Sequence, residues 1–410
     1  MGKKQFFYTT SFNSFGLRTA NMMKNMHIPL SVPCLGGRAL DYLRECVETN
    51  WVSSAGPFVE RFERQVADAV GAAHAVATVN GTAALHVALL AAGLEPGDEV
   101  LVPALTFIAP ANAVRYAGAW PVFIDVENAY WQMDPEKALE FLDRGCRWQD
   151  NRLVNRSTGR RVRGLLPVHI LGHPADMDLF VATSRKYGLI LVEDAAESLG
   201  AGYKDRKVGS LGPLTCFSFN GNKVITTGGG GMVATDDAGL AERMRYLTTQ
   251  AKDDPVEYVH NAVGFNYRMI NLQAALGCAQ MEDLKAYLNA KRAIANRYAA
   301  ALSGIRGVLL PKEASWARST WWLYTILLNE EETGVSSRDA MRRLKEMGIE
   351  SRPLWHPLHT LPPYREAFAY RVERADLLYR DALSLPSSVG LSAGDQERVI
   401  AALRSILAHA

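Results

Sequence analysis

The sequence is poor in the features that mark membrane, secreted and nucleic-acid-binding proteins. Only 5 of its 410 residues are cysteine, and this scattered, odd number gives neither a zinc site nor a disulfide framework. The 45 basic and 43 acidic side chains leave a net charge of +2, so no overall field draws the chain toward nucleic acid or a membrane. The longest clean apolar stretches, such as 87–94, are too short to cross a bilayer. We therefore expect a cytoplasmic protein without a membrane, nucleic-acid or metal partner.

Two nucleotide-binding loops are also missing. A P-loop requires Gly-Lys-Ser/Thr, but Asn222 precedes Lys223 and Val224 follows it. No stretch matches G-x-G-x-x-G, because Val233 stands where the last glycine would have to follow the glycine run 228–231. The sequence therefore argues against a P-loop NTPase and a nicotinamide oxidoreductase.

Short apolar runs that alternate with helical patterns fill much of the chain, which at 410 residues is long enough for two domains. Helices are expected at about 83–92 and from Ala109 onward. Strands buried on both faces are expected at 75–79, 99–102, 121–124, 164–170 and 188–192. This alternation predicts βαβ units and an α/β fold whose mostly parallel central sheet is flanked by helices.

The character of the sequence changes beyond about residue 275. A long helix is expected from roughly 272 to 302, and later elements are expected around 320–328, 336–347 and 395–408. We therefore predict a large α/β domain over 27–275 and a smaller C-terminal α+β domain over 276–410.

Two segments stand apart from this pattern. Residues 1–26 contain four basic residues and no acidic one, and they lack the apolar core of a secretory signal. We interpret them as a disordered extension or a misplaced start rather than a transit peptide. The insert 144–163 contains seven arginines and one aspartate, which is typical of a solvated loop and also of a positive lip that attracts a phosphorylated substrate. Nucleic acid is disfavoured because the single Trp148 is a poor stacking platform.

A buried strand that ends at Asp194 is the first sign of a functional site. Asp194 is expected at the carboxyl edge of the sheet, where open α/β folds bind ligands, either as the partner of a buried cation or as a helix N-cap. Lys223 lies between a strand-like segment and the glycines of 228–231. A desolvated lysine there is a nucleophilic amine able to form a Schiff base, whereas the alternative is an ordinary loop lysine.

The turn after strand 75–79 supplies a candidate phosphate site. Thr82 is the expected N-cap, and the free N–H groups of the following helix form a phosphate cradle, although an ordinary strand–helix turn has the same sequence. Phe107 follows the next strand, where its ring either covers a flat cofactor or fills the core. Pyridoxal phosphate uses all of these features, since it needs a phosphate cradle, an aromatic lid, a carboxylate that keeps its pyridinium protonated and a Schiff-base lysine.

With these motifs the sequence resembles the DegT/DnrJ/EryC1/StrS family of pyridoxal-phosphate-dependent nucleotide-sugar aminotransferases from about Ile28 to the C-terminus. The resemblance rests on WVSSAGPFVERFE (51–63), NGTAALHVAL (80–89), PALTFIAPANAV (103–114), VEDAAES (192–198), FSFNGNKVITTGGGGM (217–232) and GFNYRMINLQAALG (264–277). It implies the fold type I aminotransferase architecture and a homodimer whose active sites lie at the subunit interface.

Carried over residue by residue, the resemblance implies that Lys223 holds the cofactor as a Schiff base and that Asp194 pairs with its pyridine nitrogen. Glu197 occupies the place near the ring hydroxyl where the family usually has Gln or His, and Gly230 replaces the glutamate of a common T-G-E-G-G motif. Asn266 of the partner subunit would reach the phosphate. The remaining cofactor-binding residues would be Gly81, Thr82 and Ser218 at the phosphate, Phe107 on the ring, and Ala83 and Asn220.

Finer motif features narrow the substrate. SFNGNK, WVSSAG and the basic insert most resemble transaminases of legionaminic-acid and bacillosamine-type pathways, which aminate C4 of UDP-linked 4-keto-6-deoxy-N-acetylglucosamine; L-glutamate is the amino donor. The alternative is a perosamine synthase that acts on GDP-4-keto-6-deoxymannose.

The sequence also bears on other functions found in this fold. Sugar 3-dehydratases of this fold replace the lysine with histidine, and a catalytically silent sugar-binding or regulatory protein would have lost Lys223 or Asp194. The resemblance places His356 and His359 at the substrate mouth, where the alternative is a pair of packed loop histidines. Pro357 between them argues against a metal pair.

Overall fold

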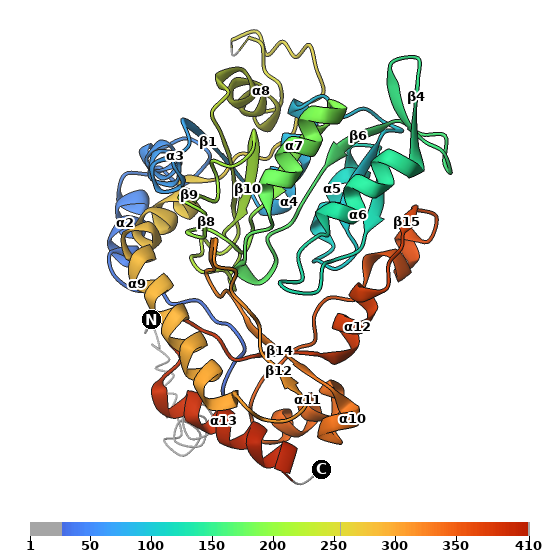
Figure 1. Ribbon diagram of the computed structural model, residues 1–410. Coiled ribbons are helices and arrows are strands. Elements are labelled where there is room, and N and C mark those ends of the chain that lie inside the picture. Colours follow the sequence, from blue (N-terminus) through green and yellow to red (C-terminus); the bar gives the residue numbers. More distant parts are fainter. Residues whose placement is uncertain (1–26, 255, 409–410) are drawn as a thin grey trace, which may run out of the picture.

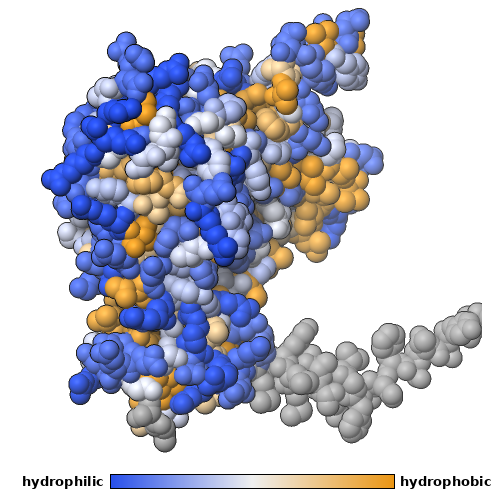
Figure 2. Space-filling view, turned by 90° about the vertical axis from the view of Figure 1, so that its right-hand side faces the viewer, coloured by the Kyte–Doolittle hydropathy of each residue, from blue (hydrophilic) through white to orange (hydrophobic). Residues whose placement is uncertain are grey.

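The computed structural model describes residues 27–254 and 256–408 (Figure 1). The extension expected over residues 1–26 lies outside the described residues. A central sheet with flanking helices forms the upper part of the molecule in Figure 1, and a smaller sheet with its own helices forms the lower part. Figure 2 shows a largely polar surface with an apolar area on one side of the upper part. Across the described residues, no helix combines the length and apolar character needed to span a bilayer.

Eight strands form the central sheet, and seven of them point the same way. In spatial order they are β1 (His74–Thr78), β11 (Gly231–Thr235), β10 (Leu214–Ser218), β7 (Ile190–Asp194), β6 (Val162–Leu165), β2 (Glu99–Pro103), β3 (Trp120–Ile124) and β15 (Ala369–Tyr370). β11 runs against the others in this sheet. Every residue of β2 and β7 is buried, as expected for strands covered on both faces. The predicted α/β fold with a mostly parallel sheet is confirmed.

Helix α4 (Gly81–Ala91) lies at the centre of this architecture. Its sequence is apolar on nearly every side, and it packs against β7, β10 and β11. A helix without a polar face belongs in the core, so α4 is held firmly with its N-terminus beside the ends of these strands. The other helices around the sheet are α2 (Ala39–Glu48), α3 (Pro57–Val70), α5 (Ala109–Tyr116), α6 (Pro135–Glu140), α7 (Met177–Tyr187) and α8 (Ala238–Thr248).

A second hydrophobic core lies in the C-terminal part. Its antiparallel sheet has the order β12 (Val308–Leu309), β14 (Tyr324–Leu328) and β16 (Ala382–Leu385). The surrounding helices are α10 (Glu330–Thr333), α11 (Ser337–Glu346), α12 (Arg374–Asp381) and α13 (Ala393–Ala408). The long helix α9 (Asn271–Leu302) contributes Cys278 to the large core and Ile294 to the second core. The boundary expected at 275 therefore falls inside α9.

Other segments also cross this boundary. Ile28 packs in the second core, whereas Tyr364 packs in the large one, and β15 extends the central sheet beside β3. A small sheet pairs β13 (Ala317–Arg318) with β8 (Gly202–Tyr203), which in turn pairs with β9 (Arg206–Lys207). The division into domains 27–275 and 276–410 stays a prediction. The structure shows that the segments named above pack across the boundary between these two domains.

The basic insert 144–163 contains a hairpin, formed by β4 (Cys146–Gln149) and β5 (Arg152–Asn155). It leads directly into the start of β6, so it lies at the amino ends of the parallel strands. There Arg161 lies 3.3 Å from Glu95, and the Arg160 guanidinium lies 4.3 Å from the centroid of the Trp120 ring. Ligand sites of such sheets lie at the opposite, carboxyl edge, so the expected positive lip does not lie at the ligand-binding edge of its own chain.

Candidate active site

A cavity of about 260 Å³, open to solvent, lies at the carboxyl ends of β7 and β10, beside the N-terminus of α4. Since parallel strands end at the same edge of a sheet, residues far apart in the sequence meet there. The structure brings together eight of the residues singled out from the sequence, namely Gly81, Thr82, Phe107, Asp194, Glu197, Ser218, Asn220 and Lys223.

The N-terminus of α4 forms one wall of this cavity. Asn80, not Thr82, is the N-cap, because Asn80 has an extended backbone and its Oδ1 accepts a hydrogen bond from the Ala83 N–H at 2.8 Å. A Cβ on Gly81 would lie 2.8 Å from the Cβ of Ser218, so the turn passes close to β10. The Ser218 hydroxyl has no hydrogen-bond partner among the described residues. The turn therefore offers free donors to an anion.

Asp194 ends β7 and is nearly fully buried. Its Oδ1 accepts a hydrogen bond from the Ala196 N–H at 2.9 Å, and within the described chain its other oxygen has no partner. Burial raises the pKa of Asp194 above its ordinary value, opposed by the Ala196 N–H and by the charge of Lys223. A cation placed in the cavity against this carboxylate would stabilise its ionised form.

Lys223 and Glu197 form an ion pair inside the cavity. The Nζ atom of Lys223 lies 3.3 Å from Oε1 of Glu197, whose Oε2 accepts a hydrogen bond from the Leu171 N–H at 2.7 Å. Burial raises the pKa of Glu197 to about 7, although the charge of Lys223 and the Leu171 N–H oppose the rise. The carboxyl group therefore changes its protonation state near neutral pH, directly beside the amine.

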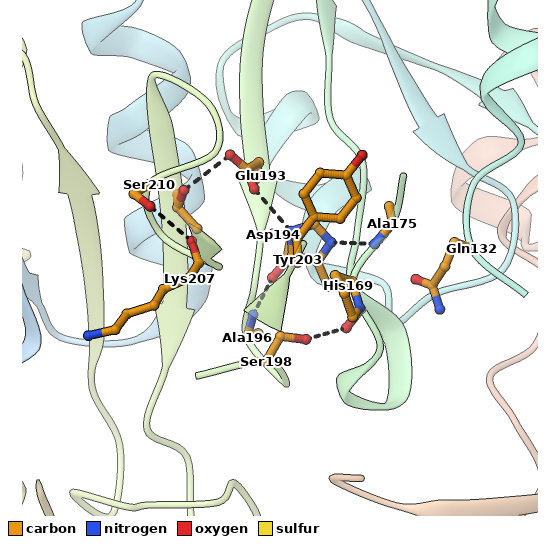
Figure 3. Close-up of polar contacts among 12 residues, drawn as sticks. Gln132, His169, Ala175, Glu193, Asp194, Ala196, Ser198, Tyr203, Lys207 and Ser210 are labelled. Atoms are coloured by element: carbon orange, nitrogen blue, oxygen red, sulfur yellow. Dashed lines mark hydrogen bonds and ion pairs between the residues drawn. The ribbon is translucent and has the colours of Figure 1, made fainter. Parts of the chain in front are cut away.

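A buried imidazole–carboxylate pair supports Asp194 from the other face of β7 (Figure 3). Nε2 of His169 lies 3.0 Å from Oε2 of Glu193, and both side chains are fully buried. The Nδ1 atom of His169 accepts a hydrogen bond from the Ala175 N–H, so Nε2 carries the proton and donates to Glu193. The His169 N–H donates to the Asp194 carbonyl at 2.9 Å. This pair fixes the end of β7 and hence the position of Asp194.

Four residues singled out from the sequence are not among those lining the cavity. The N–H of Ala83 is taken by Asn80, which removes Ala83 as an anion donor. Asn266 forms a bridge with Thr249 in the loop before α9. His356 bonds to Thr360 at 2.9 Å, and Nε2 of His359 lies 3.8 Å from Asp376. The two histidines thus make the contacts of packed loop residues.

Sequence reasoning missed two tryptophans that line the cavity. Trp322 and Trp355 lie side by side with nearly parallel rings, 6.4 Å between centroids. Both come from the C-terminal part of the chain, 322 − 223 = 99 and 355 − 223 = 132 residues beyond Lys223. In the segment 355–359 the sequence suggested the histidines as site residues, but the adjacent Trp355 is the residue that lines the cavity.

Pyridoxal phosphate fits the donors of this cavity. The N-terminus of α4 and the Ser218 hydroxyl suit its phosphate, and the unpaired oxygen of Asp194 suits a protonated pyridine nitrogen. Phe107 lines the cavity and is 53% exposed, so one face of its ring is free to cover a flat molecule. The Lys223 amine lies in the same space.

Comparisons with known proteins point to one family. The DegT/DnrJ/EryC1/StrS aminotransferase family matches residues 33–404. A GDP-perosamine synthase of Caulobacter vibrioides is 43% identical over 383 residues, which cover 93% of this chain and 98% of that protein. A GDP-perosamine synthase of Escherichia coli O157:H7 is 37% identical over 381 residues, with 93% and 98% covered. The crystal structure of a family aminotransferase from Brucella abortus has a TM-score of 0.82 at 27% identity, covering 97% of this chain and 99% of that one.

The family match includes the segments that build the cavity, from the turn before α4 to the C-terminal tryptophans. The donors of that cavity are those that the cofactor of the family requires. The chain therefore belongs to the DegT/DnrJ/EryC1/StrS family and is a pyridoxal-phosphate-dependent sugar aminotransferase.

Proposed function

We propose that the chain transfers the amino group of L-glutamate to C4 of GDP-4-keto-6-deoxymannose. The observation that carries this proposal is the nearly full-length likeness to two proteins named GDP-perosamine synthase, at 43% and 37% identity. The motif resemblance favours a UDP-linked N-acetyl sugar as the substrate, whereas these relatives favour the GDP-linked sugar. The UDP-linked sugar becomes an outcome of the test below.

Lys223 is the proposed catalytic residue, and Asp194 is its proposed electronic support. Pyridoxal phosphate, when bound, supplies an electron sink for the carbon that loses or gains a proton. The Nζ atom of Lys223 removes the proton from Cα of glutamate and later delivers a proton to C4 of the sugar. The Asp194 carboxylate keeps the pyridine nitrogen protonated, and its burial makes this charge pairing strong. Glu197 holds the Lys223 amine at 3.3 Å.

The proposed phosphate contacts come from Gly81, Thr82 and Ser218, and Asn220 is a further proposed cofactor-binding residue that lines the cavity. Phe107 covers the ring. Ala83 is left out of this set because its N–H caps the turn through Asn80.

A homodimer is part of the proposal, with Asn266 of the partner subunit reaching the phosphate. Asn266 lies outside the cavity of its own chain and is exposed to solvent. The large apolar residues left exposed include Phe107, at 53%, which lines the cavity just before α5, and Tyr116, at 58%, which ends α5. Such exposure next to a site is typical of a surface that a second subunit covers.

The visible spectrum of the purified protein tests the proposal. We expect an absorption band from the bond between Lys223 and the cofactor, bleached by L-glutamate and restored by GDP-4-keto-6-deoxymannose alone. Restoration by the UDP-linked sugar instead would replace the substrate. The Lys223→Ala variant, as a folded dimer, is expected to lack both the band and transamination, and normal turnover by it would remove Lys223 from its role.

A further inference from the structure

The amine of Lys223 rests on the face of an indole from the C-terminal part of the chain. Its Nζ lies 4.0 Å from the centroid of the Trp322 ring. The Nε1–H of the same ring donates to the carbonyl of Asn222 at 2.7 Å. Trp322 is buried, with 4% of its surface exposed. One side chain thus contacts both the Lys223 amine and the backbone immediately before it.

The backbone of Trp322 is fixed to the same loop that holds Glu197. The Trp322 N–H donates to the Leu171 carbonyl at 3.1 Å, and the Leu171 N–H donates to Glu197. Two residues earlier, the Thr320 hydroxyl donates to the Glu197 carbonyl at 2.8 Å. A Cβ on Gly172 would lie 2.1 Å from this hydroxyl oxygen, so glycine permits the close approach. Glu197 and Trp322 are therefore positioned together, as a single unit.

A buried lysine holds Trp322 from the side of α9. The Nζ atom of Lys291 donates to the Trp322 carbonyl at 2.8 Å and also to the Ser387 carbonyl. Lys291 is 2% exposed and forms no ion pair with any described residue. A buried amine with two carbonyl partners and no carboxylate is a costly arrangement, and here it serves to fix the main chain at Trp322.

We propose that Trp322 is a positioning residue for Lys223, whose amine it holds between an aromatic face and the Glu197 carboxylate. The proposal rests on the catalytic role proposed for Lys223. The negative face of an indole attracts an ammonium group, and a lysine has four rotatable bonds to restrict. These two contacts therefore restrict the orientation of a long, flexible side chain.

Glu197 and Trp322 contact the Lys223 amine in chemically different ways, and this difference explains why both are needed. Glu197 can accept a proton from the amine, whereas the indole face attracts the ammonium without being able to take its proton. Lys223 has to act at two atoms, Cα of the donor and C4 of the sugar. The neutral indole face keeps the amine within reach of both carbon atoms and leaves its proton available for transfer. Trp355, parallel to Trp322, supports the orientation of the ring.

The test compares Trp322→Leu and Trp322→Phe with Trp321→Phe in the holoenzyme. Trp321 is a matched control, because it is the adjacent indole and lines a separate cleft. The glutamate half-reaction is followed in a single turnover, with protonated and Cα-deuterated glutamate. We expect Trp322→Leu to slow the reaction about tenfold and to increase the deuterium isotope effect, with little change in KM for glutamate. Trp322→Phe, which keeps an aromatic face, is expected to recover much of the rate, and Trp321→Phe all of it.

An unchanged rate and isotope effect in Trp322→Leu would overturn the proposal, and so would equal impairment of the Phe and Leu variants. Borohydride reduction followed by peptide mapping separates this outcome from a failure of the Lys223 assignment, since the cofactor must be trapped on Lys223 in every variant. Trapping on another lysine would reject Lys223 itself. If Trp322→Leu does not fold, the comparison of Trp322→Phe with Trp321→Phe decides, because only the former is expected to show a larger isotope effect than the native enzyme.

Discussion

Replacement of Lys291 by Met should make the free energy of unfolding less dependent on pH above pH 7. Burial lowers the pKa of Lys291 from 10.5 to about 7. The native state therefore binds fewer protons than the unfolded state between pH 7 and 10.5, and this group makes the protein more stable as the pH rises. The shift of 10.5 − 7 = 3.5 pKa units corresponds to about 5 kcal/mol over the whole range. Between pH 7 and 9 the expected gain is about 2 kcal/mol.

Urea unfolding of the native protein and Lys291→Met at pH 7, 8 and 9 measures this gain. Met has a similar length and no charge, but it leaves the carbonyls of Trp322 and Ser387 without their donor, at a cost of about 1–3 kcal/mol each. The variant should therefore be less stable than the native protein, by a margin that grows with pH. Lys285→Met, at an exposed position of the same helix, is the control and should give a constant margin. A constant margin in Lys291→Met as well would refute the reasoning that Lys291 is buried and charged at a cost.

Three further predictions follow from the cavity. Asp194→Asn should lower kcat roughly a hundredfold in a glutamate half-reaction assay, because a buried charge pair is lost while the shape of the side chain is kept; a change below threefold would contradict the pairing. Gly81→Ala should weaken cofactor binding about tenfold or more in equilibrium dialysis, since its Cβ would lie 2.8 Å from that of Ser218, whereas Gly36→Ala, with nothing within 4 Å of its Cβ, should bind normally. In the cofactor-free protein, Glu197→Gln should gain stability relative to the native chain as the pH rises from 4.5 to 7. The raised pKa of Glu197 in the native state means that ionisation of this group destabilises the native chain over that range. A gain that shrinks with pH in urea unfolding would contradict the raised pKa.

The strands and helices around the cavity were predictable from the lengths of their apolar runs and from the turn residues that bound them. The run 75–79 corresponds to β1 (His74–Thr78), and the long helix expected at 272–302 corresponds to α9 (Asn271–Leu302). The presence of Asp194 and Lys223 in the cavity was predictable because each lies in a contiguous motif next to a strand end or a glycine run. A pattern confined to neighbouring residues can be recognised in the sequence before the fold is known.

The remainder depends on contacts between distant residues or on backbone angles. Asn80 and Thr82 both have capping side chains, and the extended φ of −165° at Asn80 decides between them. β15 has two residues, too few for any period, and its place beside β3 is set by tertiary packing. Nothing near Trp322 in the sequence points to Lys223, because the contact joins residues about a hundred positions apart.

The long-range contacts of the site also set the order in which it can form during synthesis. The Ile28 N–H donates to the Gly348 carbonyl, and the Trp322 indole closes on Asn222 across 100 positions. A chain emerging from the ribosome therefore makes the turn of α4, β7 and Lys223 long before it makes the wall that orients the amine. Until then the apolar cavity faces solvent, and such incomplete states are prone to aggregation and slow to complete. A chain truncated before residue 320 is expected to need a chaperone rather than to act as a smaller aminotransferase.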